Sequence, residues 1–291
     1  MGLFGWLARL LPDTGRSVDE LARRLDMPAD DLHAVQLAYR EFAVPRRSGA
    51  ARAICAPEPD LKQVQKRIYI RVLKRLPVHQ AVHGFVHGRS IVTNPLPLRR
   101  RPVVINMDIE DFFPSTTEKR LRRYFRKIGW SRATTDLLAR LTTHRGGLPP
   151  GAPTSPCLSN VLNIKMDSRL AGLARSHGAR YTRYADDMTF SLAEDDQETV
   201  RSILGGARHI VAEFGYRLHD RKKLHIARQH QQQRVTGLVV NEKVQLPREL
   251  RRRLRAVEHH LENGLPASMS REEFEGRQAV QEMIDHQTGR A

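Results

Sequence analysis

The chain of 291 residues is strongly basic, with 49 Lys and Arg against 32 Asp and Glu, a formal net charge of +17 and a sequence pI near 10.7. Positive charge spread along a whole chain is typical of proteins that bind phosphate backbones or anionic membrane surfaces. No apolar run approaches the roughly 20 residues that span a bilayer, so an integral membrane protein is excluded and nucleic acid is the expected partner.

The N-terminal residues and the cysteine content both favour a soluble, cytoplasmic protein. Residues 1–6 lack the basic start and cleavage site of a secretory signal, and position six lacks the Ser or Thr expected for myristoylation. Cys55 and Cys157 have neither metal-ligand spacing nor the pattern of a disulfide framework.

The first hundred residues are predicted to contain helices, a basic hairpin and a fixed loop. Residues 1–40 should be helical, with a cap at Ser17. Residues 45–57 are predicted to form two strands around a Gly-centred turn, whose arginines suit a triphosphate or template backbone, or equally a solvated surface. A helix over residues 61–76 follows, and then a loop at residues 83–91 whose histidines we expect to be structural.

A strand is predicted over residues 103–109, because this run is almost wholly apolar and ends with an acid. A buried carboxylate without a partner is costly, so Asp108 needs a cation or a metal. After a turn at residues 110–115, the spacing of apolar residues predicts a helix that ends at Gly129.

The second half of the chain should alternate helices and strands. A Pro/Gly-rich loop at residues 147–160 opens a helix that is capped by Ser155 and runs through Met166. A helix over residues 200–214 follows the hairpin described next. The remaining predicted elements are a strand entered from residues 215–223, a strand at 234–241, and a basic helix from Pro247 onward.

Residues 181–192 predict a β-hairpin with two adjacent carboxylates at its turn, Asp186 and Asp187. Like charges this close repel, which favours a bound divalent cation, although a solvated Asp-Asp turn is the alternative on this stretch alone. If the strand at 103–109 pairs beside the hairpin, Asp108 becomes a third carboxylate on the same sheet. Such a set binds two Mg²⁺ or Mn²⁺ ions ~3.5–4 Å apart for phosphoryl transfer. In so basic a chain, this predicts a nucleotidyltransferase that acts on a nucleic-acid template.

Six segments in the same order resemble the reverse transcriptases of bacterial retrons, over about residues 40–262. Residues 184–187 resemble the family's YxDD box, and residues 106–115 its first acidic motif. The other segments that resemble family motifs are residues 148–160 (LPQGAPTSPxLSN), 45–57 (the fingers hairpin), 83–91 (HGFxxGRSI) and 215–223 (the Lys-bearing motif). Residues 235–237 also resemble the VTG triplet of retron enzymes.

The resemblance implies an α+β right-hand polymerase with fingers, a ferredoxin-like palm and a short helical thumb. Its implied domains are an N-terminal helical extension at 1–40, fingers at 41–104, a palm at 105–243 (with 130–155 partly returning to the fingers) and a thumb at 244–291.

The resemblance also implies roles for individual residues. Asp108, Asp186 and Asp187 would be catalytic and would bind two Mg²⁺ ions, with Mn²⁺ as the alternative, assisted by the backbone carbonyl of Ile109. Phe113 would be the steric gate against a ribose 2′-hydroxyl. The other implied nucleotide-binding residues are Arg47, Arg52, Asp111, Gly151 and Lys222, of which Arg47 and Arg52 reach the triphosphate and Lys222 protonates pyrophosphate. The implied nucleic-acid contacts are Gly237 and Leu238 near the primer terminus, and Arg251, Arg252 and Arg255 along the duplex.

Retron enzymes use dNTPs to copy part of a structured, cognate non-coding RNA from an internal 2′-hydroxyl, and leave a branched RNA–DNA hybrid. Several of these systems act in phage defence with a separate effector protein. Two alternatives stay open from the residues: a bacterial reverse transcriptase with another kind of priming, and an RNA-binding protein with a decayed active site.

Four features of the chain depart from the family pattern. Pro150 replaces the Gln of LPQG, a side chain expected beside the incoming nucleotide. Residues 94–98 keep only the Asn of the retron Asn-Ala-x-x-His segment, and His219 stands where Asn is usual. The chain ends soon after the basic helix, so we expect a thumb that is short or completed by RNA.

Overall fold

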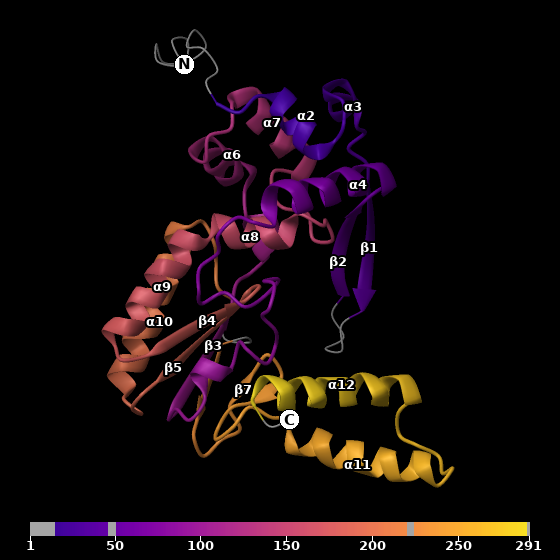
Figure 1. Ribbon diagram of the computed structural model, residues 1–291. Coiled ribbons are helices and arrows are strands. Elements are labelled where there is room, and N and C mark those ends of the chain that lie inside the picture. The colour runs from indigo at the N-terminus through magenta and orange to yellow at the C-terminus, as the bar shows by residue number, and fades with distance from the viewer. Residues whose placement is uncertain (1–14, 46–50, 220–223, 290–291) are drawn as a thin grey trace. The chain divides into compact units, whose positions relative to one another are not determined.

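The computed structural model of the chain describes residues 15–45, 51–219 and 224–289 (Figure 1). The chain divides into two compact units. The first unit comprises Met1–Val78 and Asp111–Ile164, and the second comprises His79–Glu110 and Lys165–Ala291. Helices and sheets occur together, which confirms the predicted α+β class.

The first unit is mostly helical. Its helices are α2 (Val18–Leu25), α3 (Ala29–Ala34), α4 (Pro59–Ile68), α5 (Phe112–Ser115), α6 (Glu118–Lys127), α7 (Arg132–Thr142) and α8 (Ser155–Leu162). Helix α2 begins as predicted, because the Ser17 hydroxyl accepts a hydrogen bond from the Glu20 amide at 3.2 Å. The buried Leu21, Leu61, Phe125 and Trp130 join these helices in one apolar core.

A two-stranded antiparallel hairpin, β1 (Tyr39–Pro45) and β2 (Ala51–Pro57), completes the first unit. The predicted hairpin at 45–57 was therefore placed too late in its first strand, which begins within the segment expected to be helical. Six of the seven β1 residues are exposed. Without a continuous apolar face, this strand left no clear periodic signal in the sequence.

The second unit is built on a four-stranded antiparallel sheet in the order β4-β5-β3-β6. The strands are β3 (Val103–Asp108), β4 (Arg180–Tyr184), β5 (Asp187–Leu192) and β6 (His225–Arg228). Helix α9 (Ile164–Ser176) precedes β4, and α10 (Gln197–Glu213) follows β5. The order strand, helix, two strands, helix, strand, with the first strand inside the sheet, is the ferredoxin-like topology that was expected.

Apolar side chains fix the register of this sheet. Val103, Val104 and Ile105 of β3 are fully buried between the neighbouring strands. Helices α9 and α10 lie side by side along the sheet (Figure 1), where Leu173 of α9 approaches Gly206 of α10. A central strand buried in this way reads as a continuous apolar run, which is why the sequence predicted it.

The last part of the second unit differs from the prediction. The expected single strand at 234–241 is a tight hairpin of β7 (Arg234–Val235) and β8 (Leu238–Val239), turning at Thr236 (φ 48°) and Gly237 (φ 82°). The basic helix α11 (Arg248–Glu262) is confirmed, but a further helix, α12 (Arg271–Gln287), was not predicted. Apolar residues of α11 and α12 pack together around Val257, Phe274 and Ile284.

Other boundaries also differ. Helix α4 ends at Ile68 and continues as a π-helical turn, Tyr69–Leu73, and a short 3-10 helix forms at Leu96–Leu98. The helix expected from 155 through 166 breaks between α8 and α9 at Asn163. The N-cap of α8 is Thr154, not Ser155, and its side chain makes no cap hydrogen bond. The Ser155 hydroxyl donates to the Pro149 carbonyl at 2.8 Å. Among the described residues, no helix combines the length and apolarity needed to cross a bilayer.

Candidate active site

The structure brings the three predicted acids to one end of the second unit's sheet. Strands β3 and β5 pair so that Asp108 lies opposite Asp187. Asp186 lies in the two-residue turn between β4 and β5, and its carbonyl accepts a hydrogen bond from the Ile109 amide at 3.1 Å. The side chain of Asp108 is largely buried, that of Asp186 is half-buried and that of Asp187 is exposed.

Residues 217–219, which follow α10, pair with the backbone of residues 108–110. The amide of His219 donates to the Asp108 carbonyl at 2.9 Å, and the His219 Nε2 lies 3.3 Å from Asp108 Oδ1. Next to it, the Glu110 amide donates to the Arg217 carbonyl at 2.8 Å. His219, noted above as a departure from the family pattern, is therefore the neighbour of the buried carboxylate.

A buried ion pair lies directly behind the turn that carries Asp186. Arg183 of β4 and Asp167 of α9 are both fully buried, with Nε–Oδ1 and Nη2–Oδ2 distances of 2.8 and 2.7 Å. The Tyr181 hydroxyl also donates to Asp167 Oδ1, at 2.9 Å. The remaining guanidinium nitrogen, Nη1, donates to the carbonyl of Ala185 at 2.8 Å. This guanidinium therefore connects helix α9 to the residue that precedes Asp186.

The surroundings of Arg183 and Tyr181 keep both side chains protonated. Burial alone would lower the pKa of Arg183, but the Asp167 carboxylate reverses that effect and raises it. Burial raises the pKa of Tyr181 well above its ordinary value, and the Asp167 carboxylate raises it further, so the phenol stays protonated as a donor. Ala185 itself has a positive φ of 56°, which such a hydrogen bond helps to hold.

The loop at residues 83–91 supports the same turn from another direction. The backbone of β4 pairs with it, because the Arg183 amide donates to Ala81 and the His83 amide donates to Arg183, both at 2.8 Å. A Cβ on Gly84 would lie 2.5 Å from the Ala185 nitrogen, so only glycine allows this approach.

His83 has a structural role, as predicted. Its Nδ1 lies 3.0 Å from the Thr93 hydroxyl. Burial lowers the pKa of His83 to about 4, with Arg89 adding to the effect. The ring is therefore neutral near pH 7.

In the first unit, the structure describes the side-chain surroundings of the predicted nucleotide-binding residues Asp111 and Phe113 and the backbone of Gly151. Asp111 is exposed, has a φ of 44° and precedes α5. Phe112 is buried in the core, whereas Phe113 is half-buried with its ring 5.7 Å from that of Phe112. Gly151 has a φ of 119°, and a Cβ there would lie 2.9 Å from Ile54 Cγ2, which explains glycine in this loop.

Two further predicted residues, Arg47 and Lys222, lie outside the described residues, and for Arg52 only the backbone within β2 is described. In the second unit, Gly237 lies at the β7–β8 turn and Leu238 is buried. Arg252 and Arg255 are exposed on α11, and Arg251 is half-buried.

The sequence analysis missed Arg183 and Asp167. An arginine in a strand is normally assigned to a solvated face, and an acid in a helix likewise. The one available signal was position: Arg183 follows Tyr181 and Thr182, which are buried, in strand β4.

The chain matches the family model described as "Reverse transcriptase (RNA-dependent DNA polymerase)" over residues 44–240. This chain belongs to the reverse transcriptases. Among curated proteins, it is 39% identical over 287 residues to the retron Mx162 reverse transcriptase of Myxococcus xanthus, with 87% of this chain and 59% of that protein covered. It is 34% identical over 235 residues to the retron Ec86 reverse transcriptase of Escherichia coli, with 79% and 72% covered.

These similarities identify a reverse transcriptase of the bacterial retron type, as the motifs indicated. The retron Mx65 reverse transcriptase of Myxococcus xanthus is 38% identical over 265 residues, with 85% of this chain and 61% of that protein covered. The chain thus spans about three fifths of the length of the two Myxococcus proteins.

A likeness to a solved structure supports the polymerase fold. Apo telomerase from Candida tropicalis, truncated from the C-terminal domain, matches with a TM-score of 0.50 and 13% identity, over 72% of this chain and 55% of that one. Together with the sheet topology, this similarity agrees with the right-hand polymerase class predicted above.

Proposed function

We propose that the chain is an RNA-directed DNA polymerase of retron type that extends DNA on an RNA template with dNTPs. The observation that carries this proposal is that Asp108 and Asp187 are strand partners in a chain of the reverse transcriptase family. Asp186 is held beside them because its backbone carbonyl accepts a hydrogen bond from the Ile109 amide. Three carboxylates from two distant segments are thereby held at one end of a buried sheet.

The donor set fits divalent magnesium. Asp108, Asp186 and Asp187 offer hard carboxylate oxygens, which suit Mg²⁺ or Mn²⁺ better than softer metals. We infer that these residues hold two Mg²⁺ ions, with the backbone carbonyl of Ile109 as a further ligand. When bound, such ions lower the pKa of an attacking hydroxyl and stabilise the departing pyrophosphate.

Other residues of the chain hold the three carboxylates in position and place charged groups near them. The His219 imidazole beside Asp108 and the Arg183 guanidinium behind Ala185 orient the carboxylates. Arg183 is thus a positioning residue rather than one that touches substrate. From the family resemblance, we further propose that Phe113 discriminates against ribose, and that Arg47, Arg52, Asp111, Gly151 and Lys222 contribute to nucleotide binding.

Nucleic-acid binding is proposed for the β7–β8 turn and for the exposed face of α11. Gly237 and Leu238 would lie near the primer terminus. Arg252 and Arg255 are exposed and lie one turn apart on α11, whereas Arg251 is half-buried beside the apolar side that carries Leu254 and Val257. By contrast, Arg253 on the same helix donates hydrogen bonds to the hydroxyl and carbonyl oxygens of Ser268.

The salt dependence of RNA binding tests this assignment. Arg252→Ala and Arg255→Ala should each weaken binding and reduce the slope of log affinity against log salt by about 0.7–0.9. Arg253→Ala is the matched control, because that side chain is already engaged within the protein. Equal slopes for all three variants would contradict the proposed surface.

The polymerase proposal is tested by dNTP incorporation on an RNA template in Mg²⁺. The wild-type chain should extend a primer, and the Asp186→Ala, Asp187→Ala double variant should not. Full activity in the double variant would overturn the proposal.

We also propose that DNA synthesis is primed in the way that is typical of retrons. We infer that a cognate, structured non-coding RNA serves as both template and primer, and that the product is a branched RNA–DNA hybrid. In this proposal the enzyme acts in the cytoplasm, in phage defence with an effector protein. Sequencing of the nucleic acid that co-purifies from native cells tests the priming step: RNA-linked DNA joined at a 2′-hydroxyl is expected, whereas unbranched DNA would contradict it.

A further inference from the structure

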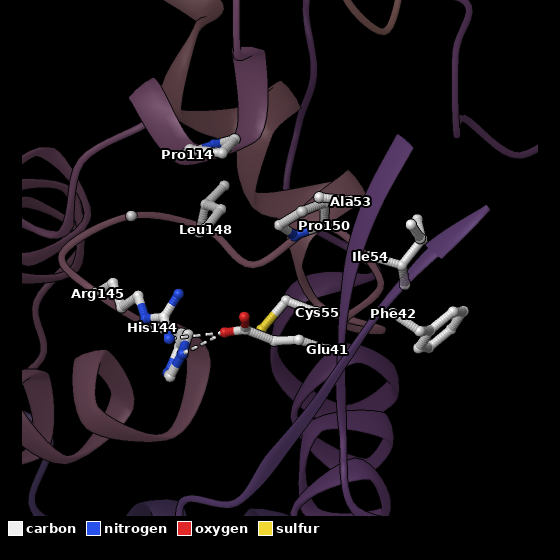
Figure 2. Close-up of a pocket in the computed structure, with 12 residues that line it drawn as sticks. Glu41, Phe42, Ala53, Ile54, Cys55, Pro114, His144, Arg145, Leu148 and Pro150 are labelled. Atoms are coloured by element: carbon white, nitrogen blue, oxygen red, sulfur yellow. Dashed lines mark ion pairs between the residues drawn. The ribbon is translucent and has the colours of Figure 1, made fainter. Parts of the chain in front are cut away.

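A second group of chemically reactive side chains lies in the first unit, on the wall of a cavity of about 460 Å³ (Figure 2). Glu41 of β1 and Cys55 of β2 are direct partners across the hairpin. His144 and Arg145 approach them from the loop that follows α7. None of these residues was assigned a role in the reaction proposed above.

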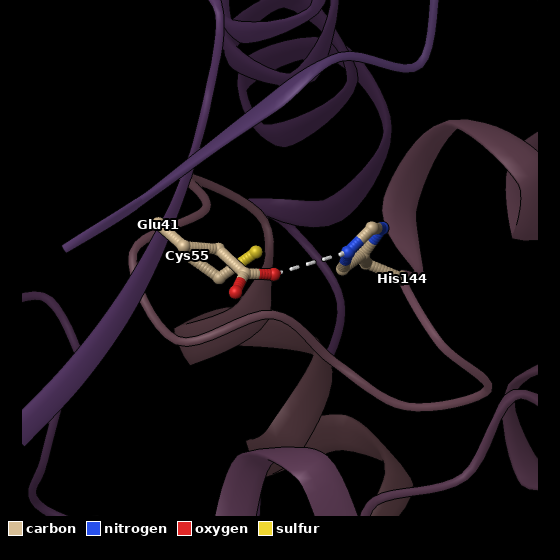
Figure 3. Close-up of side chains that lie close together, drawn as sticks. All are labelled: Glu41, Cys55 and His144. Carbon is tan, nitrogen blue, oxygen red and sulfur yellow. Dashed lines mark ion pairs between the residues drawn. The ribbon is translucent and has the colours of Figure 1, made fainter.

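The three ligand-type atoms of this group converge. The carboxylate of Glu41, the thiol of Cys55 and a ring nitrogen of His144 all lie within 4.8 Å of one another (Figure 3). The His144 Nε2 is 3.8 Å from Glu41 Oε1. Ligand atoms bound tetrahedrally to one zinc ion are ~3.3–3.6 Å apart, since the bonds are about 2.0–2.3 Å long. Side-chain rotations that move these atoms by ~1 Å would therefore complete the set.

The supporting residues give the group a defined shape. The Cys55 amide donates to the Pro150 carbonyl at 2.7 Å, which anchors β2 beside the loop that borders the cavity. The Tyr39 ring lies 4.4 Å from that of His144 and limits its rotation. The Tyr39 hydroxyl in turn accepts a hydrogen bond from the Gln65 Nε2 at 3.1 Å. Two of the three ligands are thus held by neighbours on fixed elements.

From this geometry we propose that Glu41, Cys55 and His144 form a zinc-binding site that links the β1–β2 hairpin to the loop after α7. One thiolate, one imidazole and one carboxylate are a donor set for Zn²⁺, because the sulfur ligand disfavours the hard ions Mg²⁺ and Ca²⁺. Zinc uptake releases the thiol proton of Cys55 to solvent, since the thiolate is the ligand. The site is separate from the carboxylates of the second unit and does not depend on the polymerase proposal.

Arg145 is the internal competitor for this site. Its Nη2 lies 2.9 Å from Glu41 Oε1, the same oxygen that His144 approaches. The Arg145 side chain is 74% exposed, so it can leave the carboxylate without breaking a buried contact. In this proposal the guanidinium occupies the carboxylate in the metal-free chain and gives way to Zn²⁺.

Metal binding to the full-length chain tests the proposal. After chelation and dialysis, the wild-type protein should bind one Zn²⁺ in addition to any ion held by the second-unit acids. Co²⁺ in its place should produce a near-ultraviolet sulfur-to-cobalt charge-transfer band, which carboxylates alone cannot give. The Asp186→Ala, Asp187→Ala variant should retain both signals, which separates this site from the polymerase site.

Single substitutions assign the ligands. Cys55→Ser should abolish the cobalt band and weaken Zn²⁺ binding by at least about 100-fold, and Glu41→Gln and His144→Gln should each weaken it by roughly 10- to 100-fold. Arg145→Ala should tighten binding by roughly three- to tenfold, because a positive charge next to the ion is removed. A merely adventitious surface ion would not respond to all four changes in this pattern.

The second cysteine is the matched control. Cys157 lies in the same unit, with its Sγ 3.5 Å from the Leu73 carbonyl, and Cys157→Ser should leave binding and the cobalt band unchanged. Since Glu41 is half-exposed, Glu41→Gln gives a folded ligand variant even if Cys55→Ser disturbs the buried position. Unchanged Zn²⁺ affinity in Glu41→Gln and Cys55→Ser, or a cobalt complex without a sulfur band, would overturn the proposal.

Discussion

Two hairpins of this chain, β4–β5 and β1–β2, present charged side chains in opposite surroundings. Behind the β4–β5 turn, the side chains of Arg183 and Asp167 are both 0% exposed. Beside the β1–β2 hairpin, the ion pair of Arg145 and Glu41 is 74% and 50% exposed. The charges at the β4–β5 turn are therefore held by buried protein partners, whereas those at the β1–β2 hairpin are largely solvated.

Burial of the ion pair explains why the β4–β5 turn is held more rigidly than the β1–β2 hairpin. A buried ion pair has lost its water, so it is stable only if its atoms have protein partners in one geometry. That constraint gives the Asp186 turn a fixed support. An exposed pair exchanges freely with water and contributes little to stability, so its members remain available to a ligand. The first arrangement suits a reaction centre and the second an exchangeable metal.

Breaking the buried pair should have the largest effect on stability. Arg183→Met leaves the Asp167 carboxylate buried without its cation, which should cost about 3–5 kcal/mol of unfolding free energy. Urea denaturation measures this change. Arg228→Ala removes the exposed pair with Asp195, at 2.9 Å, and should cost below about 1 kcal/mol. Similar losses in both variants would contradict the contrast between buried and exposed charge.

The same pair separates stability from positioning. In the double variant Asp167→Leu, Arg183→Met, much of the lost stability should return, because no buried charge is left. Polymerase activity should stay low, since the hydrogen bond from Arg183 to the Ala185 carbonyl is still missing. The readout is kcat against KM for the dNTP: a positioning role predicts a lower kcat at restored stability, and recovery of both would contradict it.

Acidification should destabilise the loop beneath the same turn through His83. The pKa of His83 is lowered to about 4 by burial and by Arg89, against about 6.5 in an unfolded chain. The unfolded state therefore binds more protons between these values, and the unfolding free energy falls as the pH drops from ~6.5 to ~4, by roughly 2–3 kcal/mol.

Denaturation of wild type and His83→Gln at pH 7 and pH 4.5 measures that contribution. The variant should lose less stability on acidification than the wild type. His87→Gln, an exposed histidine of the same loop, is the control and should follow the wild type. Identical pH dependence in all three proteins would contradict the role of His83.

Substitution of glycine by alanine should have opposite effects at Gly84, which contacts a neighbouring backbone, and at Gly205, which has free space around it. Gly84→Ala places a Cβ 2.5 Å from the Ala185 nitrogen and should cost about 1–3 kcal/mol, with polymerase activity reduced on the order of tenfold or more. Gly205→Ala in α10 meets nothing within 4 Å and should be neutral or stabilising by up to about 1 kcal/mol. Thermal unfolding and primer extension provide the measurements; a neutral Gly84→Ala would contradict the proposed support of the turn.

The smallest stability effect is expected at the exposed hairpin. Without added metal, Glu41→Gln should change the unfolding free energy by below about 1 kcal/mol, because the carboxylate is half-exposed and its partner Arg145 more so. A loss comparable to that of Arg183→Met would show that the two hairpins are held in the same way.

The sequence predicted those parts of the fold that leave a local pattern of apolar and strand-forming residues. Strand β3 was found from its continuous apolar run, the β4–β5 hairpin from strand-forming residues on both sides of an acidic turn, and helix α10 from apolar residues at helical spacing. From these elements, the meeting of Asp108 with Asp187 followed as a conditional prediction, and the register of β3 and β5 confirms it.

The remaining features depend on contacts between distant residues. The pairing of Arg183 with Asp167 arises only when α9 packs on the sheet, and a charged residue in either element looks solvent-exposed in the sequence. The group of Glu41, Cys55 and His144 requires the β1–β2 register and the loop after α7. Cysteine spacing alone does not reveal this group, because only one of its three members is a cysteine and Glu41 was not predicted to lie in the strand opposite Cys55.

The central claim is that Asp108, brought beside Asp187 by β3, completes the carboxylate set for metal-dependent DNA synthesis. Single-nucleotide incorporation on an RNA template, measured for Asp108→Ala across a range of Mg²⁺ concentrations, tests it most directly, with the surface acid variant Asp195→Ala as control. We expect a loss on the order of 10³-fold in rate for Asp108→Ala at every Mg²⁺ concentration, with Asp195→Ala close to wild type. Wild-type incorporation by Asp108→Ala would contradict it.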